Sequence, residues 1–95
     1  MAEDNSIFVG AKPFMNYVTG VVMQFTTKGA DTVTVKARGK FISRAVDVAE
    51  VAAKRFLENA IEPRSISINS EEFTNKEGKQ VRVSTIEISL ARKDA

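Results

Sequence analysis

Four cations stand close together in the stretch KARGKFISRAVD, residues 36–47. They fall within nine residues and no acid separates them: Lys36, Arg38, Lys40 and Arg44. The whole chain of 95 residues has a formal net charge of only +2, so the rest of the sequence is net negative. The positive charge is therefore local, and clustered lysines and arginines of this kind bind anions such as phosphate.

The surroundings of these cations predict an anion-binding site. Gly39 allows a tight turn and a close approach of the backbone to a ligand. The helical pattern that follows begins with unpaired N–H groups and the positive end of a helix dipole. Arg38, Lys40 and Arg44 add formal charge there, whereas Lys36 belongs to the preceding strand and is assigned no contact. The alternative interpretation is a solvated loop whose cations balance nearby acids or aid solubility.

The sequence lacks the motifs that hold a single nucleotide. A P-loop requires G-x-x-x-x-G-K-[ST], and the segment RGKF lacks both the first glycine and the hydroxyl that holds magnesium. A chain of backbone phosphates fits better, because it rewards several spread cations and needs no single cage. Since no element for reading base edges is visible, we expect binding that is independent of nucleotide sequence.

Composition excludes most of the usual enzyme machinery. Without cysteine the chain has no disulfide, no thiolate nucleophile and no thiolate zinc site. Without histidine it has no imidazole base and no Ser-His triad. Glu71 and Glu72 are adjacent on an expected strand and point to opposite faces, so they cannot act as a carboxylate pair. We therefore expect no catalysis, no metal and no cofactor.

Two amphipathic helices are predicted to position the cations. The first opens with Pro13 as its first helical residue and ends at Gly29 in the left-handed conformation. Its apolar stripe consists of Phe14, Tyr17, Val18, Val21, Val22 and Phe25. The second runs from Phe41 to near Asn59 with apolar residues every three to four positions. Lys12 stands just before the first helix, which we expect to open at the same end of the sheet as the basic stretch.

Strand patterns complete the predicted fold. Residues 6–10 form a short apolar strand, and residues 31–37 alternate valine with polar residues, as in a strand with one buried face. The last third predicts a β-hairpin around residues 75–78. Its second strand shifts from odd-numbered to even-numbered apolar residues near Thr85. Either a β-bulge lies there, or the far half of the hairpin leaves the core as a protruding arm, which we favour.

The resulting order βαβαββ predicts an α/β (α+β) two-layer sandwich. We expect one domain over residues 1–95, with a four-stranded mixed sheet, two helices on one of its faces and a protruding hairpin formed by the third and fourth strands. The N-terminus carries acids where a signal peptide carries cations, and the longest uncharged stretch is too short to span a bilayer. The protein is therefore expected to be intracellular.

Several segments, in order along the chain, resemble the Alba family of archaeal chromatin proteins. They are KPFMNYV at residues 12–18, VKARGKFISRAVD at 35–47, RFL at 55–57 and GKQVRVSTIEISL at 78–90. The resemblance extends from about Ile7 to Arg92. It implies a homodimer that binds double-stranded DNA without marked sequence preference, also binds RNA, and coats and compacts or protects the chromosome in the cytoplasm.

The resemblance also implies roles for individual residues. Contacts of the protein body with the DNA backbone would fall on Lys12, Asn16, Arg38, Lys40 and Arg44. The hairpins would reach along the minor groove and bring Lys76, Lys79 and Arg82 to DNA, although the hairpin tip is electrically neutral and composition alone predicts a solvated loop. Phe56 matches the position at which dimers of the family pack against one another.

Two departures and two alternatives qualify this interpretation. Ala11 stands where the family often has a lysine, which puts regulation by acetylation at that position in doubt, and Lys40 replaces a frequent arginine. A lysine contacts phosphate as a point charge and not through a bidentate fork. The alternatives are an RNA-binding protein, such as an RNA chaperone or a ribonucleoprotein subunit, and a small interaction domain with an acidic protein partner.

Overall fold

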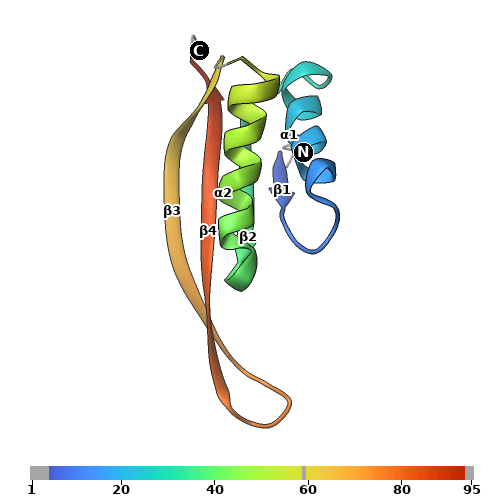
Figure 1. Cartoon of the computed structure of the whole chain (residues 1–95). Helices are drawn as coiled ribbons and strands as arrows, with labels where there is room; N and C mark the ends of the chain where they lie inside the picture. Colours follow the sequence, from blue (N-terminus) through green and yellow to red (C-terminus); the bar gives the residue numbers. More distant parts are fainter. Residues whose placement is uncertain (1–4, 59, 94–95) are drawn as a thin grey trace.

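In the computed structural model, which describes residues 5–58 and 60–93, four strands form one sheet and two helices cover one of its faces (Figure 1). The strands are β1 (Ser6–Phe8), β2 (Thr32–Arg38), β3 (Ile61–Thr74) and β4 (Gln80–Arg92). The helices are α1 (Phe14–Thr26) and α2 (Ile42–Val51), and α2 is flanked by a 3-10 turn, η1 (Gly39–Phe41), and a π-helical turn, η2 (Ala52–Phe56). The predicted βαβαββ order and two-layer arrangement are confirmed.

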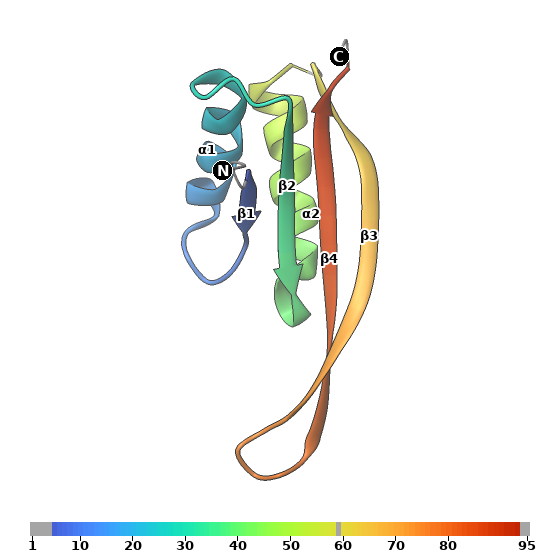
Figure 2. The same cartoon turned by 180° about the vertical axis from the view of Figure 1, so that it is seen from behind.

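The sheet is mixed, as expected, with the strand order β1-β2-β4-β3. β1 pairs in parallel with β2, whereas the β2–β4 and β4–β3 pairs are antiparallel. Seen from behind, the face opposite the helices is open (Figure 2). Because β1 and β2 are parallel, the segments that follow them leave the same edge of the sheet. These segments carry Lys12 and Lys40.

The core lies between the helices and the sheet. Val33 and Val35 of β2 are fully buried while the threonines between and before them are not, which confirms the predicted alternation. Helix α1 buries Tyr17, Val18, Val21 and Phe25 from its predicted stripe, and α2 buries Ala45, Val48 and Ala49. Ile88 and Leu90 of β4 complete this apolar layer.

The helix ends differ in detail from the prediction. Pro13 precedes α1 with an extended ψ of 141°, so it is not the first helical residue, and its carbonyl accepts a hydrogen bond from the Asn16 N–H at 3.0 Å. Gly29 adopts the predicted left-handed conformation with a φ of 68°. The second helix begins with η1 and widens into η2 before Leu57, and its predicted end at Asn59 lies outside the described residues.

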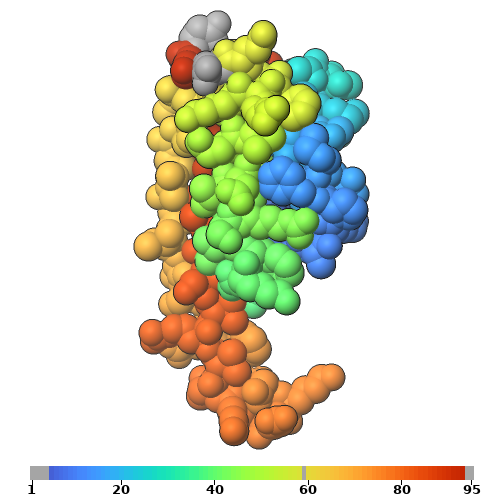
Figure 3. Space-filling model, viewed as in Figure 1, coloured from blue at the N-terminus to red at the C-terminus, as the bar shows by residue number. Residues whose placement is uncertain are grey.

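The β3–β4 hairpin extends well beyond the body of the molecule. β4 pairs with β2 only from Thr85 onward, so residues 80–84 pair with β3 alone. This part forms a narrow projection below the body in Figure 3. We call residues 70–84 the arm. Pairing with β3 is continuous through Thr85 and the one register shift lies between Pro63 and Ser65, so the bulge alternative is wrong and the protruding arm is confirmed.

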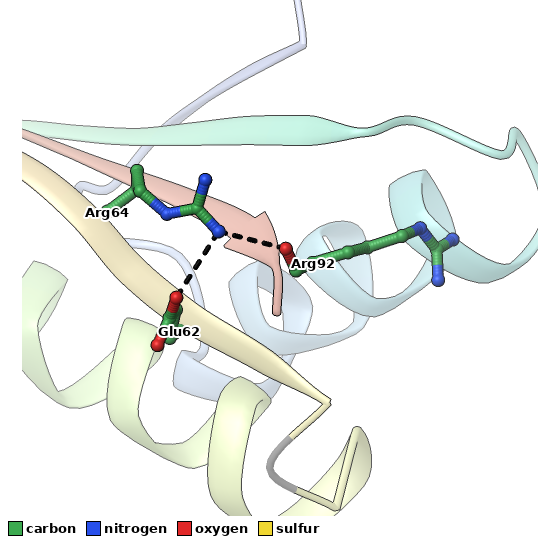
Figure 4. Close-up of polar contacts among 3 residues, drawn as sticks. All are labelled: Glu62, Arg64 and Arg92. Carbon is green, nitrogen blue, oxygen red and sulfur yellow. Dashed lines mark hydrogen bonds and ion pairs between the residues drawn. The ribbon is translucent and has the colours of Figure 1, made fainter. Parts of the chain in front are cut away.

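Two arginines form hydrogen bonds at the end of the sheet opposite the arm, and one of them contacts α1 (Figure 4). The Arg64 guanidinium donates hydrogen bonds to the Glu62 carboxylate at 3.2 Å and to the Arg92 carbonyl at 2.9 Å. The Arg92 guanidinium in turn donates to the Phe25 carbonyl at 2.7 Å, near the end of α1. These bonds hold the start of β3 and the end of β4 in place, at the end of the hairpin opposite the arm.

Candidate nucleic-acid interface

Two segments that are far apart in sequence meet at one edge of the sheet. The Arg44 guanidinium of α2 donates a hydrogen bond to the Gly10 carbonyl at 2.9 Å and lies 5.9 Å from the centroid of the Tyr17 ring. The Tyr17 hydroxyl accepts a hydrogen bond from the Lys12 backbone N–H at 3.0 Å. These contacts hold the loop before α1 against the start of α2, so the two helices open at the same end, as expected.

Lys12, Asn16, Arg38 and Lys40 are exposed at this edge, and Arg44 is half-buried beside them. Gly39 has a φ of 57°, which makes the tight turn between Arg38 and η1. Neither η1 nor α2 has an acid in its first turn. We call Lys12, Asn16, Arg38, Lys40 and Arg44 the body cluster.

One carboxylate of the arm reaches the body cluster. Glu71 forms an ion pair with Arg38 at 3.0 Å, and both side chains are about half exposed. Such an exposed pair contributes little to stability, typically about 0.2 to 1 kcal/mol. Glu71 therefore partly neutralises the charge of Arg38. Lys40 lies over the Phe41 ring, with 5.4 Å between its Nζ and the ring centroid.

The arm carries a second set of cations, separate from the body cluster. Lys76, Lys79 and Arg82 are exposed, and Arg82 pairs with Glu72 at 3.0 Å. The tip is ordered by Asn75, whose side-chain oxygen accepts hydrogen bonds from the backbone N–H groups of Glu77 at 2.9 Å and Lys79 at 3.0 Å. Gly78 in the same loop has a φ of 80°, a conformation that favours glycine.

Phe56 lies away from both sets of cations. It is the last residue of η2, at the opposite end of the second helical segment from the body cluster, and its exposed fraction is 50%. Figure 1 shows this end of the segment at the top of the molecule, opposite the arm. The structure thus groups the residues singled out from the sequence into three places: body, arm and far helix end.

Comparison with known proteins identifies the family. The model of the Alba family matches residues 5–70. The chain is 54% identical over 92 residues to the DNA/RNA-binding protein Alba of Methanocella arvoryzae, covering 97% of this chain and 94% of that protein. It is 53% identical to the DNA/RNA-binding protein Alba 1 of Archaeoglobus fulgidus, covering 98% of this chain and 100% of that protein. This chain belongs to the Alba family.

A solved Alba structure has the same fold as this family member. Alba from Thermoplasma volcanium matches it with a TM-score of 0.83 and 45% sequence identity, covering 92% of this chain and 99% of that one. The resemblance of the sequence motifs to the Alba family is thereby confirmed over nearly the whole chain.

Two features are absent from the described residues of this Alba chain: a group of side chains that could hold a metal ion, and a helix that could cross a membrane. Within residues 5–58 and 60–93 there is no group of three or more acidic, histidine or cysteine side chains that could hold a metal ion. In the same residues no helix is long and apolar enough to cross a membrane.

The sequence of this Alba chain did not predict that Glu71 and Glu72 of the arm form ion pairs with Arg38 and Arg82. The Glu72–Arg82 pair is directly cross-strand, so counting outward from the turn at Asn75 would have found it. The Arg38–Glu71 pair had no such signal, because it depends on how the arm leaves the body. The exposed Phe8 beside Lys36 was likewise not among the predicted site residues.

Proposed function

We propose that this member of the Alba family is a non-enzymatic protein that binds double-stranded DNA without sequence preference and coats it as a homodimer. It thereby compacts or protects the chromosome in the cytoplasm, and RNA is a further ligand. The observation that carries the proposal is the meeting of the loop before α1 and the start of α2 at one sheet edge. The relatives named DNA/RNA-binding protein Alba support the same ligand class.

The body cluster acts through the phosphate backbone. Its cations come from the loop before α1, the end of β2, η1 and α2, so they are spread along an edge and match a repeated charge better than a single anion. Asn16 adds a hydrogen-bonding side chain from the first turn of α1. Contacts of this kind position the protein on the duplex and carry no sequence information.

The arm extends the contact along the nucleic acid. It contributes to a molecule that measures 48 × 28 × 22 Å, and its tip presents Lys76 and Lys79 beyond the body. Arms of this kind can follow a groove of the duplex, and we propose that Lys76, Lys79 and Arg82 lie along the minor groove, as the resemblance to the Alba family implies.

The apolar side of β3 supports the homodimer. Ile66 and Ile68 are 61% and 80% exposed, and they pair across the sheet with Ile88 and Ile86, so they share the face that the helices cover elsewhere. Helix α2 leaves β3 uncovered in Figure 1, and Val46 of α2 is exposed as well. Exposed β-branched side chains along a sheet-edge strand fit a second copy of the chain.

Phe56 is proposed to lie where one dimer packs against the next on DNA.

Alanine variants of the body cluster test the proposal. We expect the double variant Arg38→Ala, Lys40→Ala to weaken binding to several unrelated duplexes by a similar factor of about 10, because two phosphate contacts are lost. Fluorescence anisotropy with labelled duplexes measures this. The matched control Lys28→Ala, Lys54→Ala removes the same charge from exposed positions outside the cluster. Equal losses in both variants, or a loss on one sequence alone, would contradict the proposal.

Competition separates DNA coating from a role on RNA. The labelled duplex is displaced with unlabelled duplex DNA or with structured RNA of equal length and equal phosphate concentration. DNA coating predicts that duplex DNA competes at least as well as RNA. If RNA competes at a much lower concentration, an RNA chaperone or a ribonucleoprotein subunit becomes the better description.

A further inference from the structure

A hollow of about 500 Å³ opens at the edge where β1 and β2 end. Val9, Ala37 and Val83 provide apolar parts of its wall, and the rings of Phe8 and Phe41 line it as well. Its volume falls in the range of small-molecule sites, about 300 to 1,000 Å³. Contacts with the phosphate backbone of duplex DNA need no hollow of this kind. The proposed duplex interface therefore does not explain why the hollow is present.

Cations surround the hollow. Within the described part of the chain its lining contains three of them, Lys36, Arg38 and Lys40, and no carboxylate. Phe8 and Lys36 are directly paired in the β1–β2 register, and the Lys36 Nζ lies 5.3 Å from the centroid of the Phe8 ring. Phe8 is 66% exposed, which is unusual for a large aromatic side chain on a strand. The site combines an accessible aromatic face with positive charge.

A ligand for this site needs a flat apolar face and a negative charge next to it. A nucleobase with its flanking phosphates has both, and stacking of bases on aromatic side chains is the usual means of binding single strands. In a duplex the base faces are stacked on one another, so they cannot reach an aromatic ring at the protein surface. The chemistry therefore points to an unpaired nucleotide.

We infer that this hollow binds an unpaired nucleobase of single-stranded nucleic acid, stacked on Phe8, with Lys36 and Lys40 facing the adjacent phosphates. The inference rests on the proposed nucleic-acid binding and adds a second class of substrate at the same edge. It gives this chain a means of holding single-stranded regions that a backbone contact alone does not provide.

A smaller hollow shares Phe8, Lys36 and Arg38 with the first one, but differs from it in charge. It has a volume of about 260 Å³ and its lining includes Glu71 and Glu87. These carboxylates offset the two cations, whereas the described residues that line the first hollow include no carboxylate, so we expect the phosphates of the bound nucleic acid to lie toward Lys40.

Three probes separate base binding from phosphate binding: a 12-nucleotide oligothymidylate, a 12-residue strand of abasic sites, and a DNA duplex. In Phe8→Ala we expect the ratio of oligothymidylate affinity to duplex affinity to fall by about 5- to 100-fold, the range of base–aromatic stacking. Affinity for the abasic strand, which has phosphates but no bases, falls by less than this. The control Met23→Ala truncates another exposed apolar side chain, on α1, and keeps the ratio of the unmodified protein.

A single tryptophan gives a direct readout. The chain has no tryptophan, so Phe8→Trp introduces the only indole. Its fluorescence is quenched by oligothymidylate and unaffected by the abasic strand if a base stacks on it, whereas the indole of Met23→Trp responds to neither. Fluorescence of Phe8→Trp that oligothymidylate does not quench, or an unchanged affinity ratio in Phe8→Ala, overturns the inference and leaves duplex binding intact. If the unmodified protein does not bind the duplex, the proposed function itself fails.

Discussion

At the scale of single residues, the cations of the body cluster differ in what they contact within the protein. Arg44 is half-buried and donates to the Gly10 carbonyl, so it joins two segments of the fold. Arg38 is exposed but faces Glu71 at 3.0 Å. Lys40 is exposed beside the Phe41 ring. These differences predict that replacing each cation has a different balance of effects on stability and on binding.

Arg44→Ala is expected to lower the free energy of unfolding by about 1 kcal/mol, because a part-buried hydrogen bond is lost and the Gly10 carbonyl loses its donor. Urea denaturation followed by circular dichroism measures this. Lys40→Ala serves as the comparison, since it is expected to weaken DNA binding while its unfolding midpoint stays the same. Equal stability of the two variants would contradict a structural role for Arg44.

Glu71→Gln is expected to tighten binding to duplex DNA by about two- to fivefold, because an acid beside the phosphates is removed and Arg38 is released from an exposed ion pair. Fluorescence anisotropy at fixed salt measures the change. Glu62→Gln is the matched control: it removes one acid from an equivalent pair with Arg64 at the other end of the sheet. If both variants gain equally, total charge and not the Arg38 contact is responsible.

At the scale of elements, local patterns predicted what is locally determined. The alternating valines of β2 and the stripe of α1 gave the correct strand and helix, because period-two and helical spacing are properties of a short segment. The shift in β4 near Thr85 correctly indicated an arm, because an apolar face that changes without a bulge does so where the strand leaves the core. Local patterns therefore predicted both the order of the elements and the departure of the arm.

Features that depend on distant segments were not predicted. The ion pair between Arg38 and Glu71 requires the path of the arm relative to β2. The hollow beside Phe8 is formed by residues from β1, β2, η1 and β4, and no one of these segments has a pattern that indicates a cavity. The body cluster was predictable because two parallel strands must end at the same edge, but its internal hydrogen bonds were not.

The end of the second helical segment holds a strained residue. Glu58, just after η2, has a φ of 50°, a conformation that favours glycine. Glu58→Gly is therefore expected to raise the free energy of unfolding by about 0.5 to 1 kcal/mol. Lys54→Gly, inside η2, is expected to lower it by about the same amount. Thermal or urea unfolding of both variants checks this, and a loss of stability in Glu58→Gly would contradict it.

At the scale of the whole molecule, the exposed isoleucines and the cations assigned to nucleic acid lie in different places. The body cluster and the arm tip bear the exposed cations assigned to nucleic acid, whereas the exposed isoleucines lie along β3. A homodimer that buries β3 would cover these isoleucines and leave both body clusters and both arms accessible. Each dimer would then contact the DNA backbone through two body clusters and extend two arms along the duplex.

Ile68→Asp is expected to convert the proposed dimer to a monomer, because a charge placed at the most exposed isoleucine of β3 cannot be buried against a second copy. Analytical ultracentrifugation across a range of protein concentrations measures the mass. Met23→Asp places the same charge on α1 and is expected to leave the dimer intact. A dimer that persists in Ile68→Asp would show that β3 is not the interface.

The salt dependence of binding tests the central proposal, backbone contact without sequence preference, most directly. Affinities for unrelated duplexes are measured by fluorescence anisotropy over a series of salt concentrations. The logarithm of the association constant should fall linearly with the logarithm of salt, with a slope of about −0.9 for each phosphate neutralised, and with nearly the same slope on every sequence. Lys40→Ala should reduce the magnitude of the slope by about 1 per protomer. Binding that is insensitive to salt, or confined to one sequence, would contradict the account.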